Sequence, residues 1–300
     1  MIIANNISKQ LEGKTILSQI SFHIKEHEAV GVIGKNGAGK TTLLRILSGT
    51  LKEDGGYVRL RRQENFAEDK ESLRKFSFIS GGKSLLWQDM ILQASFDNCA
   101  AMYHIPKNQY QERLSYLVES LEMEKCLQKP VQSLSLGQRA RGQFIYALLP
   151  QPELLFLDEA AIGLDVSAKE KVFMLLQELR EKRKTTIIYT SHNLTEIERI
   201  CDRVLLLEGG KLIYDGSIKH LIQRYGKDYK IYFQVINQLP DMEDLPISSY
   251  NIENQTITIT YDKQKITTAE LVSHILNQCT IKNMELEEPN LEDTIGKLLS

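Results

Sequence analysis

The sequence predicts an α/β fold over residues 1–225 and a small α+β domain over residues 226–300. In the first region, short apolar runs alternate with segments of helical periodicity, which is typical of strands interleaved with helices. After Gly226 the pattern changes. The runs YKIYFQVI, QTITITY and IKNMELEE are typical of strands, and TTAELVSHILNQC has the apolar stripe of a helix. This change marks the expected domain boundary.

Length and charge restrict the class of protein. The 300 residues suit one large α/β domain with an appended smaller one. The 37 basic and 39 acidic residues give a net charge of −2, so we expect no nucleic-acid partner. The cysteines are scattered, as in reduced cytoplasmic proteins, and no apolar run reaches the roughly 18 residues of a membrane span. Any membrane role is expected to come through a partner.

The elements of the first domain follow from its apolar runs. EAVGVIG predicts a buried strand, and KTTLLRILSG predicts the helix that follows it and ends at Gly49. From Gln63 to Pro152 strand-like runs are few, and we expect a helical subdomain over about residues 83–150. PELLFLDE and TTIIYTSH then predict buried strands around the helix VSAKEKVFMLLQELREKRK. RVLLLEGGKLIYDG predicts a hairpin.

The segment GKNGAGKT fits the pattern G-x-x-x-x-G-K-[ST] between a predicted strand and a predicted helix. Glycines let backbone N–H groups face a phosphate, and the helix N-terminus adds partial positive charge. We expect Lys40 to reach the β- and γ-phosphates and the Thr41 hydroxyl to bind Mg²⁺. The alternative is a glycine-rich turn that binds nothing, which the strand–loop–helix context disfavours. The residues expected to bind the nucleotide are Gly34, Asn36, Gly37, Ala38, Gly39, Lys40, Thr41 and Thr42.

Two predicted strands end in residues suited to phosphate chemistry. LLFLDE ends in Asp158, which is placed to hold Mg²⁺ through water, and in Glu159, which is placed to orient or deprotonate an attacking water. His192 in YTSH follows the other strand and is a candidate contact to the γ-phosphate. Taken alone, acidic residues at a strand end are often caps, and a histidine there is often structural. The phosphate loop upstream favours the chemical interpretation.

A second candidate anion loop is LSLGQ, which precedes the helix-like run RARGQFIYALL. Ser135 and the Gly137 N–H would therefore lie at a helix N-terminus suited to a γ-phosphate. Two such loops are redundant for one nucleotide within one chain. They are not redundant if two chains share the site.

Five motifs stand in one order: GKNGAGKT as Walker A, LSLGQ as the signature, LLFLDE as Walker B, GLD (Gly163–Asp165), and the SH that contains His192. In this order they resemble the nucleotide-binding domain of an ATP-binding cassette (ABC) transporter over residues 1–225. The resemblance implies a P-loop NTPase fold with an ABC ATPase core, ATP and Mg²⁺ as ligands, and ATP hydrolysis with Glu159 and His192 as catalytic residues. It assigns Mg²⁺ to Thr41 and Asp158.

In this family two such domains pair head to tail, and each signature loop closes over the ATP of the other domain. The resemblance therefore implies a homodimer, or a heterodimer with a second ABC ATPase. The residues it assigns to the shared nucleotide contact are Ser135, Gly137, Gln138 and Asp165.

The tail EEPNLEDTIGKLL resembles the EPSLED ending of ATPase subunits of ABC-2-type exporters, and GGKSLLWQDM and LSLGQRARGQ resemble stretches of their daunorubicin-resistance-like branch. In that branch the transmembrane permease is a separate polypeptide. The resemblance implies a cytoplasmic subunit that lies peripherally at the inner face of the cell membrane through this permease. The alternative is a nucleotide-sensing regulatory module with little or no productive hydrolysis.

Several positions depart from the family pattern. Gly82 stands where the family has the glutamine of its Q-loop, and Leu11 stands where an aromatic ring stacks on adenine. Ala160 and Ala161 replace the usual Pro-Thr after Glu159. Hydrolysis is still expected, and coupling to the permease is the property that these changes affect most. The transported substrate, the choice between homodimer and heterodimer, and the role of the C-terminal domain stay open.

Overall fold

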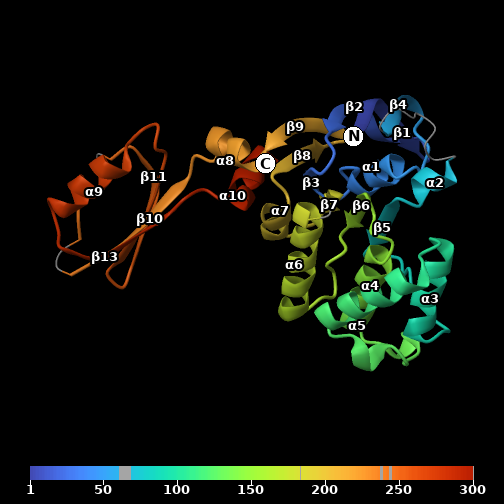
Figure 1. The fold of residues 1–300 in the computed structure, drawn as a ribbon. Helices are drawn as coiled ribbons and strands as arrows, with labels where there is room; N and C mark the ends of the chain where they lie inside the picture. Colours follow the sequence, from blue (N-terminus) through green and yellow to red (C-terminus); the bar gives the residue numbers. More distant parts are fainter. Residues whose placement is uncertain (61–68, 183, 237–238, 243–244, 300) are drawn as a thin grey trace. The chain divides into compact units, whose positions relative to one another are not determined.

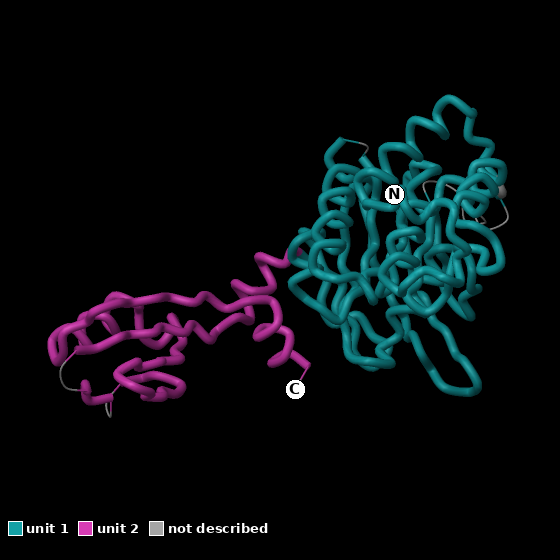
Figure 2. Tube along the Cα trace, turned by 90° about the horizontal axis from the view of Figure 1, so that it is seen from below, with its two compact units in different colours: residues 1–216 teal, residues 217–300 magenta. Residues whose placement is uncertain are grey.

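The structure, a computed structural model, describes residues 1–60, 69–182, 184–236, 239–242 and 245–299. The chain divides into two compact units, Met1–Gly216 and Ser217–Ser300 (Figure 2). Helix α8 (Ile218–Tyr225) belongs to the second unit because it packs against helix α10 (Leu291–Leu298). The sequence placed its boundary after this helix. Gln63, where the sequence pattern changes, lies outside the described residues.

A six-stranded sheet of order β5-β6-β7-β3-β8-β9 forms the centre of the first unit (Figure 1). The pairs from β5 to β8 are parallel. Strands β3, β6 and β7 are buried along their whole length, which is typical of parallel strands covered on both faces. Residues that follow these strands therefore meet at one edge of the sheet. The strands are β3 (Ala29–Ile33), β5 (Phe76–Ser80), β6 (Leu154–Asp158), β7 (Thr186–Thr190), β8 (Arg203–Glu208) and β9 (Lys211–Ser217).

A three-stranded antiparallel sheet of order β2-β1-β4 shares a core with the larger sheet. Ile7, Leu17 and Val58 from these strands pack with Val32 of β3 and Leu43 of helix α1. Ala38, in the loop between β3 and α1, lies in the same core. The strands are β1 (Ile2–Leu11), β2 (Lys14–Ile24) and β4 (Gly55–Leu60), and helix α1 spans Lys40–Leu47.

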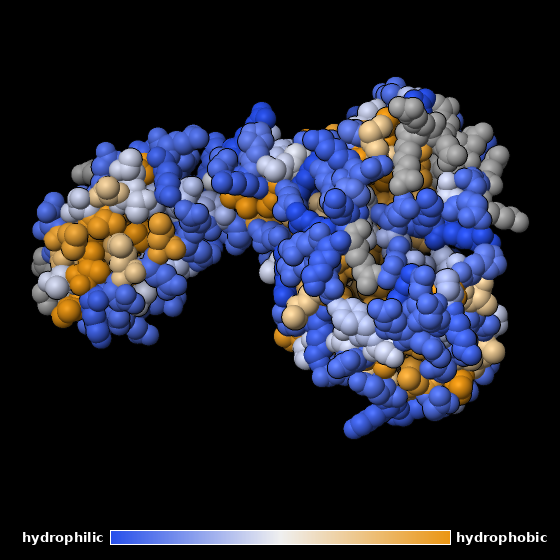
Figure 3. Space-filling view, in the orientation of Figure 1, coloured by the Kyte–Doolittle hydropathy of each residue, from blue (hydrophilic) through white to orange (hydrophobic). Residues whose placement is uncertain are grey.

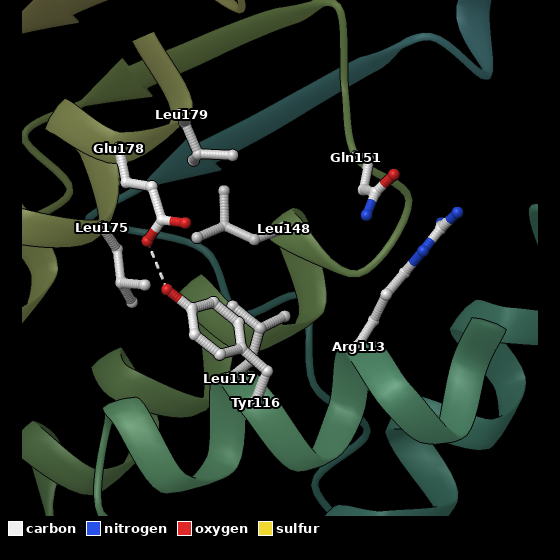
Figure 4. A pocket seen from close by; sticks show the side chains of 8 residues that line it. All are labelled: Arg113, Tyr116, Leu117, Leu148, Gln151, Leu175, Glu178 and Leu179. Carbon is white, nitrogen blue, oxygen red and sulfur yellow. Dashed lines mark hydrogen bonds between the residues drawn. The ribbon is translucent and has the colours of Figure 1, made fainter. Parts of the chain in front are cut away.

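Every regular element within residues 83–150, all of which the structure describes, is helical. Helix α4 is buried at Leu117 and Val118, and Leu121 just beyond the helix is fully buried. Leucine side chains of α4, α5 and α6 line a pocket in which the Tyr116 hydroxyl donates to Glu178 (Figure 4). The helices of the first unit not yet named are α2 (Lys70–Leu73), α3 (Leu92–Met102), α4 (Lys107–Ser120), α5 (Leu136–Leu148), α6 (Val166–Lys182) and α7 (Leu194–Ile200), with short 3-10 turns at Glu124–Cys126 and Val131–Ser133.

The second unit is a four-stranded antiparallel sheet of order β11-β12-β10-β13 that packs against helix α9. Phe233, Ile259 and Leu271 lie in its core. Apolar side chains also gather on the face of this unit seen in Figure 3, and Met284 and Leu286 of β13 are exposed. The elements are β10 (Tyr229–Val235), β11 (Ile247–Glu253), β12 (Thr256–Tyr261), α9 (Thr268–Leu276) and β13 (Ile281–Glu287).

These elements confirm the predicted α/β class and the strand and helix assignments of the tail. Within the described parts of the chain, no helix has the length and apolar character needed to cross a membrane.

Candidate nucleotide site

The loop between β3 and α1 is a glycine-rich turn at a helix N-terminus. Gly37 and Gly39 have φ angles of +80° and +99°, a region that glycine adopts without steric cost. A Cβ at Gly34 would lie 2.4 Å from the Leu207 carbonyl oxygen, and one at Gly39 would lie 2.5 Å from a methyl group of Leu17. Gly39 is the N-cap of α1 and offers no capping side chain, so the first turn of α1 is suited to bind an anion.

Lys40 lies inside this loop and is only 6% exposed. Its Nζ donates to the backbone oxygens of Gly34 at 2.7 Å and Lys35 at 3.2 Å. Burial holds the pKa of the Lys40 ammonium below its usual value, although the nearby carboxylates of Glu159 and Asp158 partly offset this effect. A cation held in this way acts as a point charge for phosphate oxygens.

The Asp158 carboxylate, at the end of β6, accepts hydrogen bonds from two hydroxyl groups. Thr41 Oγ1 donates to Asp158 Oδ1 at 3.1 Å, and Thr190 Oγ1 donates to the same oxygen at 2.8 Å. Thr41 and Asp158 bring together the hydroxyl and carboxylate oxygens that Mg²⁺ prefers, so this pair fits the metal that the sequence predicts. Among the described residues no cluster of three or more His, Cys, Asp or Glu side chains could hold a metal. Mg²⁺ needs no such cluster, because it commonly binds one or two carboxylates together with phosphates.

Glu159 has a φ angle of +53°, a left-handed conformation that is uncommon for residues other than glycine and is often found at functional sites. Its N–H donates to the Thr190 carbonyl oxygen at 3.0 Å and to Thr190 Oγ1 at 3.1 Å, which holds this conformation in place. Its Oε1 lies 2.7 Å from Nε2 of His192. The structure therefore pairs the two side chains that the sequence proposes as catalytic.

The second group of site residues, Ser135, Gly137, Gln138 and Asp165, lies at the starts of helices α5 and α6. Ser135 is the N-cap of α5, and its hydroxyl accepts from the Gln138 N–H at 3.2 Å while the Gln138 side chain accepts from the Ser135 N–H at 3.0 Å. The Asp165 carboxylate accepts from the Ala168 N–H at 2.9 Å and so caps α6. A Cβ at Gly137 would lie 3.1 Å from the Gly163 carbonyl oxygen, so the LSLGQ and GLD segments are neighbours.

Three of the positions that depart from the family pattern, Gly82, Ala160 and Ala161, lie beside the first group of site residues, which is Lys40, Thr41, Asp158, Glu159 and His192. The Gly81 N–H donates to the Asp158 carbonyl oxygen at 2.9 Å, so the segment after β5 contacts the site. Gly82 is exposed, and a Cβ built there meets no heavy atom within 4 Å. Leu11 is exposed at the end of β1, whereas Ala160 and Ala161 are buried.

Thr190 is a site residue that the sequence analysis did not identify. It is the last residue of β7 and lies opposite Asp158 in the parallel ladder. Its position directly before the SH motif is the only signal in the sequence that points to it. The side chains that line the pocket in Figure 4 include none of these candidate site residues.

Comparisons with known sequences agree with this geometry. A family model described as ABC transporter matches residues 17–162. An uncharacterized ABC transporter ATP-binding protein of Methanocaldococcus jannaschii is 32% identical, and the match covers 74% of this chain and 80% of that protein. The linearmycin resistance ATP-binding protein LnrL of Bacillus subtilis is 26% identical over 97% of this chain and 96% of its own length. A human cholesterol transporter is 30% identical over 81% of this chain, which spans 15% of that protein.

Solved structures show the same fold. The ATP-binding subunit of an ABC transporter matches with a TM-score of 0.70 at 23% identity, covering 75% of this chain and 93% of that chain. A dimeric ATP-binding cassette bound to ADP and Pi matches with a TM-score of 0.64 at 22% identity, covering 72% of this chain and 98% of that chain. The fold and the glycine-rich loop define a P-loop NTPase. The chain belongs to the family of ABC transporter ATP-binding proteins, which confirms the predicted class, an ABC ATPase.

Proposed function

We propose that this chain is the ATP-hydrolysing subunit of an ABC-2-type exporter, which dimerises on ATP and drives a separate transmembrane permease. The observation that carries the proposal is the arrangement at one edge of the parallel sheet. Lys40 lies in the phosphate loop, Thr41 is bonded to Asp158, and Glu159 is paired with His192. These are the groups that phosphoryl transfer to water requires.

The proposed reaction is in-line attack of water on the γ-phosphate, in which the protein mainly supplies position and charge. Lys40 and the loop N–H groups bind the phosphates. Glu159 accepts the proton of the attacking water, and His192 orients the Glu159 carboxylate through its Nε2 and contacts the γ-phosphate. Thr41 and Asp158 hold Mg²⁺, which neutralises charge on the phosphate oxygens when it is bound.

The proposed dimer rests on the second group of residues. Ser135, Gln138 and Asp165 lie at the starts of α5 and α6, where their contacts join them to their own helices. We propose that this group completes the nucleotide site of a partner chain, which is either a second copy or a related cassette. One solved relative with this fold is dimeric, which supports the proposal.

The proposed exporter role rests on the relatives and on the tail of the sequence. The Bacillus subtilis protein that matches nearly end to end is described as an ATP-binding protein of linearmycin resistance. Resistance through efflux is compatible with the ABC-2-type resemblance of the tail, EEPNLEDTIGKLL. In this role the chain lies in the cytoplasm at the inner face of the membrane, where it is held by its permease.

The experiment is phosphate release by the purified chain with MgATP, compared with the Glu159→Gln variant. Removing the general base should slow release by about 10²- to 10⁴-fold, while ATP still binds. Glu170→Gln, on the surface of α6, is the matched control and should leave the rate unchanged. Rapid turnover by Glu159→Gln would contradict the role of Glu159. No turnover by the unmodified chain, even with its permease, would favour the nucleotide-sensing alternative that Gly82 and Leu11 suggest.

A further inference from the structure

Glu196 of α7 is a buried carboxylate near His192 that the proposed reaction does not use. It is 6% exposed and accepts three hydrogen bonds from side chains: from Lys169 Nζ at 2.7 Å, Ser191 Oγ at 2.6 Å and Tyr189 Oη at 2.6 Å. Burial by itself raises the pKa of Glu196, but the bonds from Lys169, Ser191 and Tyr189 outweigh it and hold the pKa below its usual range. Glu196 is therefore a buried, charged carboxylate, and both of its oxygens accept hydrogen bonds from side chains.

Two of these bonds hold the segment that carries His192. Tyr189 lies in β7, and Ser191 directly precedes His192. Ser191 Oγ also accepts from the Asn193 N–H at 3.0 Å, so this hydroxyl links the residues directly before and directly after His192. Because Glu196 holds the Ser191 hydroxyl, it also restrains the backbone of the segment to which the His192 imidazole is attached.

The third bond reaches helix α6. Lys169 lies in the first turn of α6, and its N–H donates to the Asp165 carbonyl oxygen at 2.9 Å. The Asp165 carboxylate caps the same turn through Ala168. Asp165 closes the Gly163–Asp165 segment, which neighbours the LSLGQ loop. The Lys169–Glu196 ion pair therefore joins the start of α6 to the segment that carries His192.

We propose that Glu196 is a positioning residue for His192, and that its ion pair with Lys169 makes the position of His192 depend on the Gly163–Asp165 segment. The inference rests on the proposed function, because His192 matters for hydrolysis only if Glu159 and His192 act together. In a dimer, a partner that contacts the Gly163–Asp165 segment would therefore influence the Glu159–His192 pair through the side chains of Lys169 and Glu196.

The test compares Glu196→Gln and Lys169→Met with a matched control, Glu170→Gln. Arg199 forms an exposed ion pair with Glu170, so the control also removes an ion pair between α6 and α7 but leaves the His192 segment untouched. We expect Glu196→Gln and Lys169→Met to lower the single-turnover hydrolysis rate about tenfold or more. Their ATP affinity should stay within about twofold of the unmodified chain. The control should change neither quantity.

Two further variants separate a positioning role from a general loss of stability. Lys169→Arg keeps the positive charge and should restore most of the rate lost in Lys169→Met. In a double-mutant cycle, the combined Lys169→Met and Glu196→Gln variant should lose much less than the product of the two single losses, because both remove one pair. Single variants that match Glu170→Gln, or losses that simply multiply, would overturn the proposal.

A second measurement keeps the inference testable if the unmodified chain does not hydrolyse ATP. In protein labelled with ¹⁵N at histidine, the His192 imidazole signal is assigned by its loss in His192→Gln. We expect this signal to shift in Glu196→Gln and Lys169→Met and to stay in place in Glu170→Gln. The His23 signal, from β2, serves as the internal reference in all samples. A fixed His192 signal in folded Glu196→Gln would overturn the positioning role, whereas absent turnover alone would overturn only the proposed function.

Discussion

The N-termini of helices α1 and α5 both lie within glycine-containing motifs, GKNGAGKT and LSLGQ, yet they are built differently. At α1 the N-cap is Gly39, which offers no side chain to the first-turn N–H groups. At α5 the Ser135 and Gln138 side chains each accept a hydrogen bond from the other residue's N–H, which forms a complete capping box. One helix start is prepared for an external anion, and the other is already capped by its own side chains.

This difference bears on why one chain has two loops suited to phosphate. An anion at α1 competes with no capping side chain, so the first loop is suited to bind a nucleotide within a single chain. A phosphate that uses Ser135 must compete with a cap worth about 1 kcal/mol. The second loop is therefore suited to add its contacts only when a partner chain brings a phosphate already bound at its own α1.

The largest expected effect is a difference in ATP affinity between substitutions in the first loop and in the second. Lys40→Ala should weaken ATP binding to the monomeric chain by about 2–3 kcal/mol, or roughly 30- to 160-fold, because a charged hydrogen-bonding group is lost. Ser135→Ala should leave this affinity within about twofold, because Ser135 serves its own helix in the single chain. Fluorescence titration with MgATP measures both. A large loss in Ser135→Ala would show that the second loop also binds nucleotide within one chain.

A smaller effect is expected in the backbone of the two loops. Gly39→Ala should destabilise the fold by about 1–3 kcal/mol, because its φ of +99° is strained for alanine and its Cβ would collide with Leu17. Gly137→Ala should stay within about 1 kcal/mol of the unmodified chain, since the gain in helix propensity offsets a 3.1 Å contact with Gly163. Urea unfolding followed by circular dichroism measures both. Equal losses would mean that the two loops do not differ in backbone strain.

The smallest effect concerns the capping box itself. Ser135→Ala should lower the free energy of unfolding by about 1 kcal/mol, because the Gln138 N–H loses its acceptor. Ser135→Gly should cost only a few tenths of a kcal/mol, since glycine is itself an accepted N-cap. The same urea titrations measure this difference. If Ser135→Ala costs nothing, the cap is not formed in solution and the contrast with α1 disappears.

Much of the first group of candidate site residues could be predicted from the sequence, because each residue lies at or just after the end of a buried strand that its apolar run identifies. Thr190 was not predictable, since its bond to Asp158 depends on the register of β6 against β7. Strand β11 was also missed, because most of its side chains are exposed and give no alternating pattern. The place of α8 in the second unit depends on packing with α10, a contact between distant parts of the sequence.

The central claim is that two chains share one ATP, and sedimentation velocity of the Glu159→Gln chain tests it most directly. The account predicts a monomer without nucleotide and a dimer with MgATP, and it predicts that adding Ser135→Ala weakens the dimer but not ATP binding. A chain that binds MgATP and still sediments as a monomer at high concentration, alone and with its permease, would contradict the account.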